Sequence, residues 1–326
     1  KYNGYKCYDS KGYQMTDEAA AKTYEYMKKV DMFTGVKRMD FEDALAEDMV
    51  DFIEDWVKDE FIECVLAQSI NKDAVKKSGL KVLYAPLNGT GNKPVRRILK
   101  KLGVKELEVV KTQEKPDGNF PTCPYPNPEI RQVFEEGLAL TKEFPADLMI
   151  ATDPDCDRVG IAVAVDGEYK LMSGNEVGAM FCEYLLSELK AKGELPENPV
   201  VVKTVVTTEL TDRICEKYGV KISLESFGST RKPDGTMGYD TFANPVLMRN
   251  ELDCLNTDLK CFCLDSGHTH AATSGGFMSV PEYIRYFGDR IQLLHLHDND
   301  GFLDQHLFPA QGTIKWGEVF DALDEI

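Results

Sequence analysis

Three aspartates alternate in the run Asp153-Pro-Asp155-Cys-Asp157-Arg158, which lies between the apolar runs DLMIAT and VGIAV. In extended backbone alternate side chains face one side, so the three carboxylates converge. At short range in a protein-like dielectric their repulsion is large unless a cation neutralises it. Mg²⁺ is commonly held by a few carboxylates while its remaining positions take water or a substrate phosphate. The motif therefore predicts a Mg²⁺ site at this loop.

Two other structures could contain the aspartate motif, an EF-hand and an acidic turn without an ion. An EF-hand would need glycine at the sixth position and glutamate at the twelfth, where this chain has Arg158 and Ala164. An acidic turn without an ion stays open as an alternative. It is disfavoured because a loop at a strand end in an α/β sheet is where ligands bind.

Metal-capable residues also follow three apolar runs in the last third of the chain. Glu225 ends KISLE, Asp265 and His268 follow KCFCL, and His295 and His297 follow IQLL. In a barrel of parallel strands the carboxyl ends of the strands form the active face. The pattern predicts part of a (β/α) barrel with functional residues at that face.

The order of apolar patterns predicts the fold class. Residues 16–78 are expected to be helical, and short β-rich runs separated by helices follow from Lys81 onward. Strands that alternate with helices indicate an α/β protein with a mostly parallel sheet. The proline-rich stretch 112–127 is expected to be a linker or a functional surface loop. The polar stretch 191–199 is expected to mark a domain boundary.

Composition limits the classes of partner and compartment. The 326 residues carry a formal charge of −17, which repels nucleic acid across most of the surface. The chain has no apolar run of the ~18 residues that a membrane-spanning helix needs. Its nine cysteines form no CxxC pair, which is typical of free thiols in a reducing compartment. We expect a cytoplasmic protein that binds neither nucleic acid nor membrane.

The first two thirds of the chain resembles the α-D-phosphohexomutases, the phosphoglucomutase and phosphomannomutase enzymes. The segments NGYK, APLNGTGNKPVRRIL, DPDCDR, SGNEVG and VVKTVVTT carry the resemblance, in this order, up to about Val220. It implies phosphohexomutase-type domains with mixed sheets and Mg²⁺-assisted phosphoryl transfer, through a phosphoserine, on a phosphorylated hexose or another sugar.

The resemblance also assigns roles to single residues. It makes Asp153, Asp155 and Asp157 the metal ligands and places Arg158 against the active-site phosphate. Lys6 matches the lysine held to assist proton transfer, with a solvated lysine beside a turn as the alternative.

The sequence also departs from the phosphohexomutase pattern. The Ser-His-Asn-Pro loop of the phosphoserine lies ahead of NGYK in the family and is not among these residues, nor are the sugar-reading loop of the third domain and the fourth domain. Asn88 stands where related sequences often have histidine. Without the nucleophile we expect no complete mutase turnover from this chain by itself.

From about Lys221 the resemblance changes to the sugar-phosphate isomerase/epimerase superfamily, the xylose-isomerase-like TIM barrels that include endonuclease IV. The segments LESFGS, LDSGHTH, HLHDND and DQHLFPAQGTIKWGEVF carry it. It implies Glu225, Asp265 and His295 as ligands of a second divalent ion (Mn²⁺, Mg²⁺, Co²⁺ or Zn²⁺) and His268 beside the substrate. The fourth ligand of the family would follow Ile326.

Three further residues of this segment stay open between two interpretations. His297 either orients a neighbour or only forms a hydrogen bond. Asp304 and His306 resemble the Asp-x-His that binds further zinc in endonuclease IV, or they form a structural turn. DNA repair is disfavoured by the acidic charge. Sugar isomerisation or epimerisation remains, in which a metal polarises a carbonyl or hydroxyl pair while carboxylates move a proton.

We therefore interpret the chain as a composite that joins a mutase fragment to a barrel fragment near residues 216–222. Residues 1–78 are expected to be the remainder of a mutase N-terminal domain, and residues 79–190 a second domain with the metal loop. Residues 191–220 are expected to start a third domain, and residues 221–326 to form a partial TIM barrel. We expect the last part to be less well packed, because a half barrel leaves open sheet edges. The function is predicted as a phosphosugar mutase relative, with a sugar isomerase/epimerase or a non-catalytic metal- and sugar-phosphate-binding chimera as alternatives.

Overall fold

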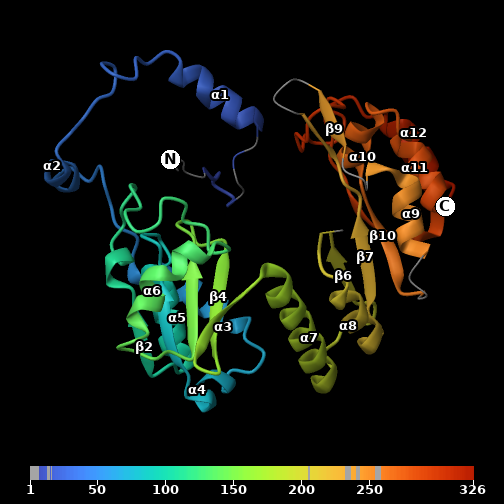
Figure 1. The fold of residues 1–326 in the computed structure, drawn as a ribbon. Coiled ribbons are helices and arrows are strands. Elements are labelled where there is room, and N and C mark those ends of the chain that lie inside the picture. The colour runs from blue at the N-terminus through green and yellow to red at the C-terminus, as the bar shows by residue number, and fades with distance from the viewer. Residues whose placement is uncertain are drawn as a thin grey trace. The chain divides into compact units, whose positions relative to one another are not determined.

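The structure, a computed structural model, shows an α/β chain that divides into two compact units (Figure 1). Unit 1 is Lys1–Gly174 and unit 2 is Asn175–Ile326. The fold-class prediction is confirmed. The residues that the structure describes are 7–12, 15, 17–204, 206–231, 236–239, 243–253 and 258–326. Lys6 lies outside the described residues.

Unit 1 contains a five-stranded sheet in the order β2-β1-β3-β4-β5. Its strands are β1 (Lys81–Ala85), β2 (Glu106–Val109), β3 (Leu148–Thr152), β4 (Val159–Val165) and β5 (Glu168–Met172). The pairs β1·β2 and β1·β3 are parallel, whereas β3·β4 and β4·β5 are antiparallel. The sheet is thus mixed rather than mostly parallel, because the short connections 153–158 and 166–167 allow only reversal, while a parallel pair needs a longer crossover.

Unit 1 also contains helices. They are α1 (Asp17–Met27), α2 (Phe41–Ala46), α3 (Asp55–Ala67), α4 (Ala74–Ser78), α5 (Asn92–Leu102), η1 (Lys111–Gln113), η2 (Arg131–Phe134) and α6 (Glu135–Leu140). The core of unit 1 lies between one face of the sheet and the η2–α6 segment, where Gly137 faces Met149 and Leu83. Among the described residues before β1, the buried hydrophobic side chains are those of Ala44 and Ile62.

Unit 2 contains a parallel four-stranded sheet in the order β11-β10-β7-β6. Its strands are β6 (Val200–Lys203), β7 (Lys221–Glu225), β10 (Lys260–Asp265) and β11 (Ile291–His295), and a separate hairpin is formed by β8 (Ser229–Arg231) and β9 (Met237–Tyr239). The helices are α7 (Gly174–Lys192), α8 (Leu210–Tyr218), α9 (Pro245–Asp253), α10 (Ser266–Thr273), α11 (Val280–Phe287), η4 (Gly288–Arg290) and α12 (Trp316–Asp324).

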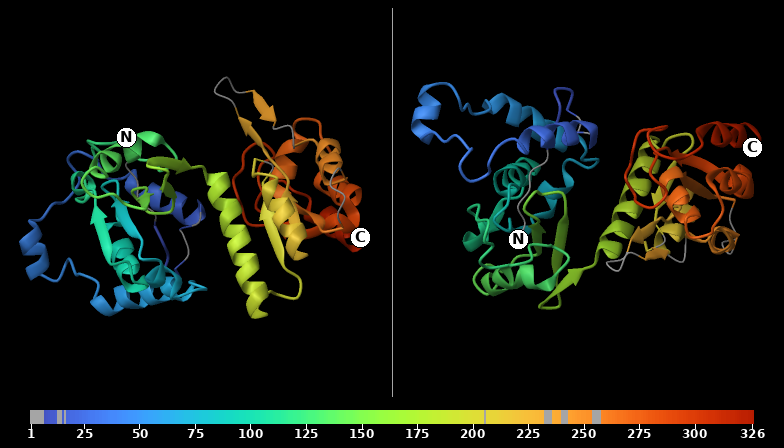
Figure 2. Two further views of the ribbon diagram at one scale, coloured as in Figure 1. Left: turned by 60° about the horizontal axis from the view of Figure 1, so that its bottom comes forward. Right: turned by 90° about the horizontal axis from the view of Figure 1, so that it is seen from above.

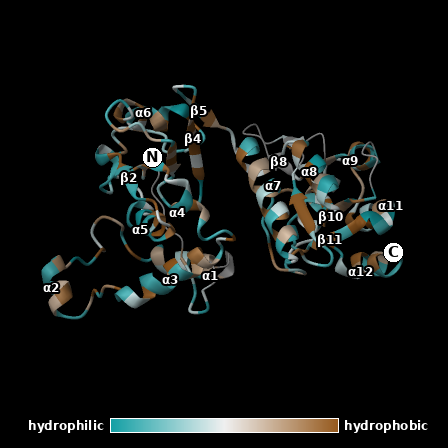
Figure 3. Cartoon of the chain, turned by 90° about the horizontal axis from the view of Figure 1, so that it is seen from below, coloured by the Kyte–Doolittle hydropathy of each residue, from teal (hydrophilic) through white to brown (hydrophobic). Residues whose placement is uncertain are grey.

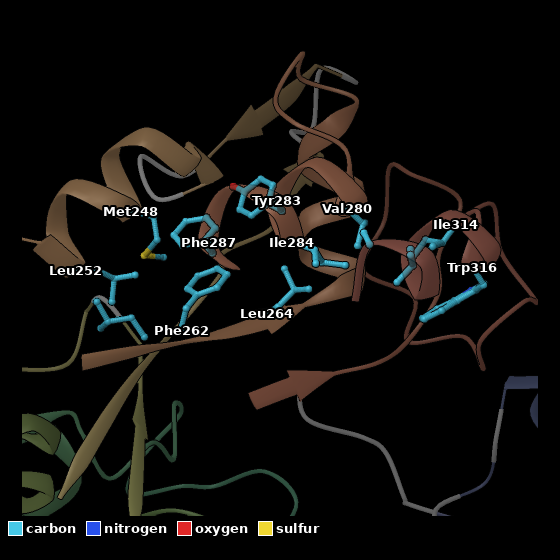
Figure 4. Close-up of a cluster of buried hydrophobic side chains, with 13 residues drawn as sticks. Met248, Leu252, Phe262, Leu264, Val280, Tyr283, Ile284, Phe287, Ile314 and Trp316 are labelled. Carbon is cyan, nitrogen blue, oxygen red and sulfur yellow. The ribbon is translucent and has the colours of Figure 1, made fainter. Parts of the chain in front are cut away.

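The core of unit 2 lies between this sheet and the helices α9, α11 and α12, which Figures 1 and 2 show on one side of the strands. Phe262 stacks on Phe287 with ring centroids 4.1 Å apart, and Leu264 and Trp316 extend the cluster (Figure 4). Leu224 of β7 belongs to the same cluster. This is the largest group of buried hydrophobic residues in the described parts of the chain. The expectation of loose packing over 221–326 therefore differs from the structure, because three helices pack together on strands of the sheet.

A second cluster in unit 2 joins α7 and α8 to β7. Ala179 and Leu186 of α7 pack with Ile214 of α8 and Ile222 of β7. The helix that the sequence analysis grouped with residues 79–190 thus packs within unit 2. The domain limits proposed from sequence stay a prediction.

The segment around residue 216, where the two resemblances meet, is a β–α–β element. Strand β6, helix α8 and strand β7 follow one another, and β6 pairs in parallel with β7. Asp212 of α8 lies between the ammonium groups of Lys203 and Lys260, at 2.6 and 2.8 Å, and all three residues are buried. This segment is therefore part of the sheet, because β6 pairs with β7 and β7 pairs with β10.

No helix among the described residues is long and apolar enough to cross a membrane.

Candidate functional site

The aspartate loop connects the antiparallel strands β3 and β4. Asp153, Asp155 and Asp157 each offer one carboxylate oxygen, and these oxygens lie within 4.8 Å of one another. Asp153 is buried, whereas Asp155 and Asp157 are exposed. Arg158, the predicted phosphate contact, follows directly and is exposed. The structure thus brings the three predicted ligands together at one edge of the sheet.

Hydrogen bonds fix the backbone of the aspartate loop. The Arg158 amide donates to Asp153 Oδ1 at 2.9 Å, and the Cys156 amide donates to the Asp153 carbonyl at 3.0 Å. Thr90 donates to the Pro154 carbonyl from its amide at 2.8 Å and from its hydroxyl at 3.1 Å. Cys156 adopts a φ of +65°, which a non-glycine residue adopts only when its surroundings hold it. The loop is therefore held from both ends and from a neighbouring segment.

The neighbouring segment is the connection between β1 and α5, which contains two glycines in close contact with the aspartate loop. A Cβ on Gly89 would lie 2.6 Å from Pro154 Cα, and one on Gly91 would lie 2.7 Å from Cys156 Sγ. Any side chain at Gly89 would therefore displace backbone between two predicted ligands. The sequence motifs alone gave these glycines no role, although Asn-Gly-Thr-Gly directly before a helix is a signal of a close backbone approach.

Asn88 anchors the same connection to the loop that follows β2. Its side-chain amide donates to the Lys115 carbonyl at 2.7 Å, and its backbone amide donates to the Gln113 carbonyl at 2.9 Å. From sequence, Asn88 was notable only because related sequences often have histidine at this position. In the structure it is buried and ties two loops beside the aspartates.

The electrostatics of the aspartate loop fit a bound cation. Burial raises the pKa of Asp153, and the Asp155 and Asp157 carboxylates raise it further, against the Arg158 amide, which lowers it. Burial and the same three aspartates raise the pKa of the Cys156 thiol. A bound divalent cation offsets the repulsion between neighbouring carboxylates, and a donor set made only of oxygen atoms suits Mg²⁺. The donors that are present therefore fit the predicted ion.

A second donor group lies at the carboxyl ends of β7, β10 and β11. Glu225, Asp265 and His295 are the last residues of these strands, and one ligand atom from each lies within 4.8 Å of the others. His295 Nδ1 lies 2.9 Å from Glu225 Oε1 and 3.7 Å from Asp265 Oδ2. Parallel neighbours end at the same edge of the sheet, which is why residues 70 positions apart meet here. One nitrogen and carboxylate oxygens are a donor set that Mn²⁺, Co²⁺ and Zn²⁺ accept.

Asp265 is the most constrained member of this group. It is buried, and its Oδ1 accepts from the His268 amide at 2.8 Å and contacts His297 Nε2 at 2.7 Å. Burial acts to raise the pKa of Asp265, but the His297 hydrogen bond and the His268 charge outweigh it, so the pKa is lowered. Burial acts to lower the pKa of His297, and the Asp265 carboxylate outweighs it, so that pKa is raised. The carboxylate form of Asp265 is therefore favoured.

His268, predicted beside the substrate, lies between the second donor group and a third. Its Nδ1 contacts the Ser226 carbonyl at 2.9 Å, and its Nε2 lies 3.4 Å from Asp304 Oδ2. His306 Nε2 lies 3.2 Å from the same carboxylate, and these three residues also offer ligand atoms within 4.8 Å of one another. The structure thus joins the Asp304–His306 pair to His268.

Comparison with known proteins identifies two kinds of domain. Residues 59–167 match the family model "Phosphoglucomutase/phosphomannomutase, alpha/beta/alpha domain II", and residues 173–230 match the model of domain III. Residues 206–326 match the "Xylose isomerase-like TIM barrel" model. Two families thus match this chain, over ranges that partly overlap. The resemblances predicted from the motifs are confirmed.

Curated relatives match the phosphohexomutase part. The phosphoglucomutase of Staphylococcus saprophyticus is 30% identical over 223 residues, which are 68% of this chain and 39% of that protein. The phosphomannomutase of Mycoplasma pneumoniae is 31% identical over 230 residues, 69% of this chain and 40% of that protein. The chain thus spans about two fifths of the length of these relatives.

Two solved structures show a limited similarity to this chain. A phosphoglucomutase/phosphomannomutase family protein from Burkholderia thailandensis has a TM-score of 0.40 and 19% identity, over 63% of this chain and 37% of that one. A D-tagatose 3-epimerase-like protein has a TM-score of 0.34 and 18% identity, over 76% of this chain and 86% of that one.

The domain III and barrel matches overlap over residues 206–230. This range contains α8 and β7, the second half of the parallel β–α–β element described above. Parallel β–α–β elements build both doubly wound sheets and TIM barrels. The same residues therefore satisfy both family patterns.

Proposed function

We propose that the phosphohexomutase part of this chain takes part in Mg²⁺-dependent transfer of a phosphoryl group between positions of a phosphorylated hexose. The observation that carries the proposal is the convergence of three carboxylates on a loop fixed by the β1–α5 connection. The relatives named phosphoglucomutase and phosphomannomutase support the substrate class. The reaction belongs to the isomerase class, because the sugar phosphate is rearranged without net loss.

Each predicted residue has one task in this proposal. Asp153, Asp155 and Asp157 hold the ion, which supplies positive charge to the phosphoryl oxygens when it is bound. Arg158, exposed beside them, adds a guanidinium that suits a phosphate. Lys6, outside the described residues, is proposed to assist proton transfer. The proposed reaction also needs a phosphoserine as its nucleophile.

Calorimetric titration with Mg²⁺ tests the metal site. The wild-type chain is compared with Asp155→Asn and with the matched control Asp166→Asn, which changes an exposed aspartate in the β4–β5 turn of the same unit. We expect Asp155→Asn to bind one Mg²⁺ ion fewer per chain than the wild type and Asp166→Asn to bind as many as the wild type. Equal binding by all three chains would contradict the metal assignment.

Assay of glucose 1-phosphate to glucose 6-phosphate conversion tests the reaction. We expect turnover with an added N-terminal domain that carries the serine loop, and its loss on Asp155→Asn. Mg²⁺- and phosphosugar-dependent stabilisation without turnover under both conditions would favour the non-catalytic binding protein instead.

We propose, as a second candidate, a divalent-metal-dependent sugar isomerase or epimerase centre in residues 221–326. The meeting of Glu225, Asp265 and His295 at the ends of three neighbouring parallel strands favours it, since this is the face where barrel enzymes place their active sites. These residues would hold Mn²⁺, Mg²⁺, Co²⁺ or Zn²⁺, which polarises a carbonyl or hydroxyl pair when it is bound. His268 would lie beside the sugar.

Mn²⁺ binding and ketose–aldose interconversion test this second centre. We expect Glu225→Gln to lose both, and the control Glu318→Gln, an exposed glutamate of α12, to keep both. Mn²⁺ binding that is indifferent to Glu225 would contradict the assignment.

We also propose that the chain acts in the cytoplasm. All eight cysteines of the described residues are free thiols. Free thiols persist in reducing compartments. Fractionation of the source cells, with disulfide mapping of the recovered chain, tests this assignment.

A further inference from the structure

His297 is a buried histidine in contact with both donor groups of unit 2. Its exposed fraction is 8%. Its Nε2 lies 2.7 Å from Asp265 Oδ1, and its ring stacks on His306 with centroids 4.0 Å apart and an interplanar angle of 6°. Asp265 belongs to the Glu225–Asp265–His295 group and His306 to the His268–Asp304–His306 group. His297 itself belongs to neither group.

The two carboxylate oxygens of Asp265 have different neighbours. Oδ1 accepts from the His268 amide and from His297, whereas Oδ2 lies 3.7 Å from His295 Nδ1, on the side of the donor group. A carboxylate held through one oxygen has lost rotation about its Cβ–Cγ bond. The other oxygen is therefore fixed in direction before any ion arrives.

The backbone around His297 fixes the ring as well. The His297 amide donates to Ser266 Oγ at 2.9 Å, and the Ser266 hydroxyl donates to the His297 carbonyl at 2.6 Å. A Cβ on Gly267 would lie 2.0 Å from His297 Cε1, so the ring lies directly on glycine backbone. The imidazole therefore has little freedom to turn away from Asp265.

The hydrogen-bond partners also indicate the tautomer. Nδ1 of His297 is buried and makes no hydrogen bond within the described residues, whereas Nε2 faces a carboxylate oxygen. A buried N–H without an acceptor is unfavourable, so the proton belongs on Nε2, from which it is donated to Asp265.

We propose that His297 is a positioning residue, which holds Asp265 so that its second oxygen faces the ion of the Glu225–Asp265–His295 site. The inference rests on the second candidate function. Partners that orient a metal ligand from behind affect metal affinity although they do not touch the ion. The His297 ring also stacks on His306, in the loop that carries Asp304. The His297 ring therefore contacts a member of each donor group, Asp265 in one and His306 in the other.

Two substitutions at His297 distinguish the effect of its hydrogen bond to Asp265 from the effect of its aromatic ring. His297→Gln keeps an N–H donor near the Nε2 position and loses the aromatic stack, whereas His297→Phe keeps a ring and loses the donor. We expect His297→Phe to weaken Mn²⁺ binding by about 10- to 100-fold in calorimetry of the full chain, and His297→Gln to stay close to wild type. Wild-type affinity in His297→Phe, or an equal loss in both variants, would overturn the proposal.

A readout without metal distinguishes this proposal from the second candidate function. Long-range ¹H–¹⁵N spectra of the histidine-labelled, metal-free chain report the tautomer of His297. We expect the Nε2–H form in the wild type and loss of that fixed tautomer in Asp265→Asn. A wild-type chain that binds no Mn²⁺ but shows this tautomer contradicts the metal centre and leaves the Asp265–His297 link intact. A different tautomer in the wild type overturns the link itself.

Discussion

Lys260 of β10 forms a buried ion pair with Asp212 of α8, with 2.8 Å between its Nζ and Asp212 Oδ2 and with each side chain at most 2% exposed. Lys203 of β6 approaches the other carboxylate oxygen at 2.6 Å. Lys203 precedes the barrel match, Lys260 follows the domain III match, and Asp212 lies where the two overlap. One carboxylate thus links the two family segments within unit 2.

We expect Asp212→Ala to destabilise unit 2 by about 3–5 kcal/mol, because two buried ammonium groups lose their counter-charge. The measurement is urea unfolding followed by Trp316 fluorescence in a Trp56→Phe background, since the chain has two tryptophans and Trp56 lies in unit 1. Glu216→Gln is the control on the same helix. It removes the more exposed pair with Arg213 and should change stability by less than about 1 kcal/mol. Equal effects of the two substitutions would contradict a stabilising role for the buried group.

Asp298 makes unit 2 sensitive to acid. It is fully buried, and its oxygens accept from the Trp316 indole at 2.8 Å and from the amides of Asn299, Ala310 and Ile314 at 2.9–3.0 Å. Burial acts to raise the pKa of Asp298, but the Trp316 hydrogen bond and the backbone amides outweigh it, so the pKa lies below its ordinary value.

A folded-state pKa below the unfolded one, near 3.9, means that the carboxylate stabilises the fold fully above that value. The contribution is lost as the pH falls through the folded pKa. We expect Asp298→Asn to be less stable than wild type at pH 7 and the difference to shrink as the pH approaches 3. Trp316 fluorescence during urea unfolding at each pH measures it. A difference that stays constant with pH would show that the charge of Asp298 contributes nothing.

The strand ends of unit 2 were predictable from sequence. Glu225, Asp265 and His295 each close an apolar run, and parallel strands bring such ends to one edge. The convergence of the three aspartates was predictable too, because they alternate within one short loop and their proximity needs no contact between distant parts of the chain. The support of the aspartate loop by Thr90 was not predictable, since Thr90 contacts a residue distant in sequence. For His297 the sequence left two interpretations open, because its contact with Asp265 is made to another element.

The missed elements have physical explanations too. The β4–β5 hairpin has a signal in Asp166-Gly167, whose φ values of +52° and +86° suit an Asp-Gly turn. The β8–β9 hairpin lies in a polar stretch without apolar alternation, so periodicity could not find it. The dense packing of residues 221–326 depends on α12, whose burial against α11 and the sheet is a long-range property.

Gly89 should be required for the shape of the aspartate loop. We expect Gly89→Ala to destabilise unit 1 by about 1–3 kcal/mol and to weaken Mg²⁺ binding, because its Cβ would lie 2.6 Å from the Cα of Pro154. Gly118→Ala is the control, since nothing lies within 4 Å of its Cβ position. Thermal unfolding and Mg²⁺ calorimetry of both variants test this. Unchanged Mg²⁺ affinity in Gly89→Ala would show that the loop tolerates the shift.

Two adjacent residues of α3 should behave in opposite ways. Ile62 is 2% exposed on the side of α3 where Asp59 and Glu63 pair with Arg97 and Lys101 of α5, whereas Phe61 is 58% exposed. Figure 3 shows hydrophobic and hydrophilic residues interspersed along this helix. We expect Ile62→Ala to lower the free energy of local opening of α3 by about 2–5 kcal/mol in amide hydrogen exchange, because a packed side chain leaves a cavity.

Phe61→Ala should change that opening free energy by less than about 0.5 kcal/mol, because the ring has few packing contacts to lose. Both variants are measured in the full chain, with the amides of α6 as an internal reference for the rest of unit 1. A loss of protection in Phe61→Ala as large as in Ile62→Ala would contradict this prediction, because it would mean that the Phe61 ring is packed against other atoms in solution.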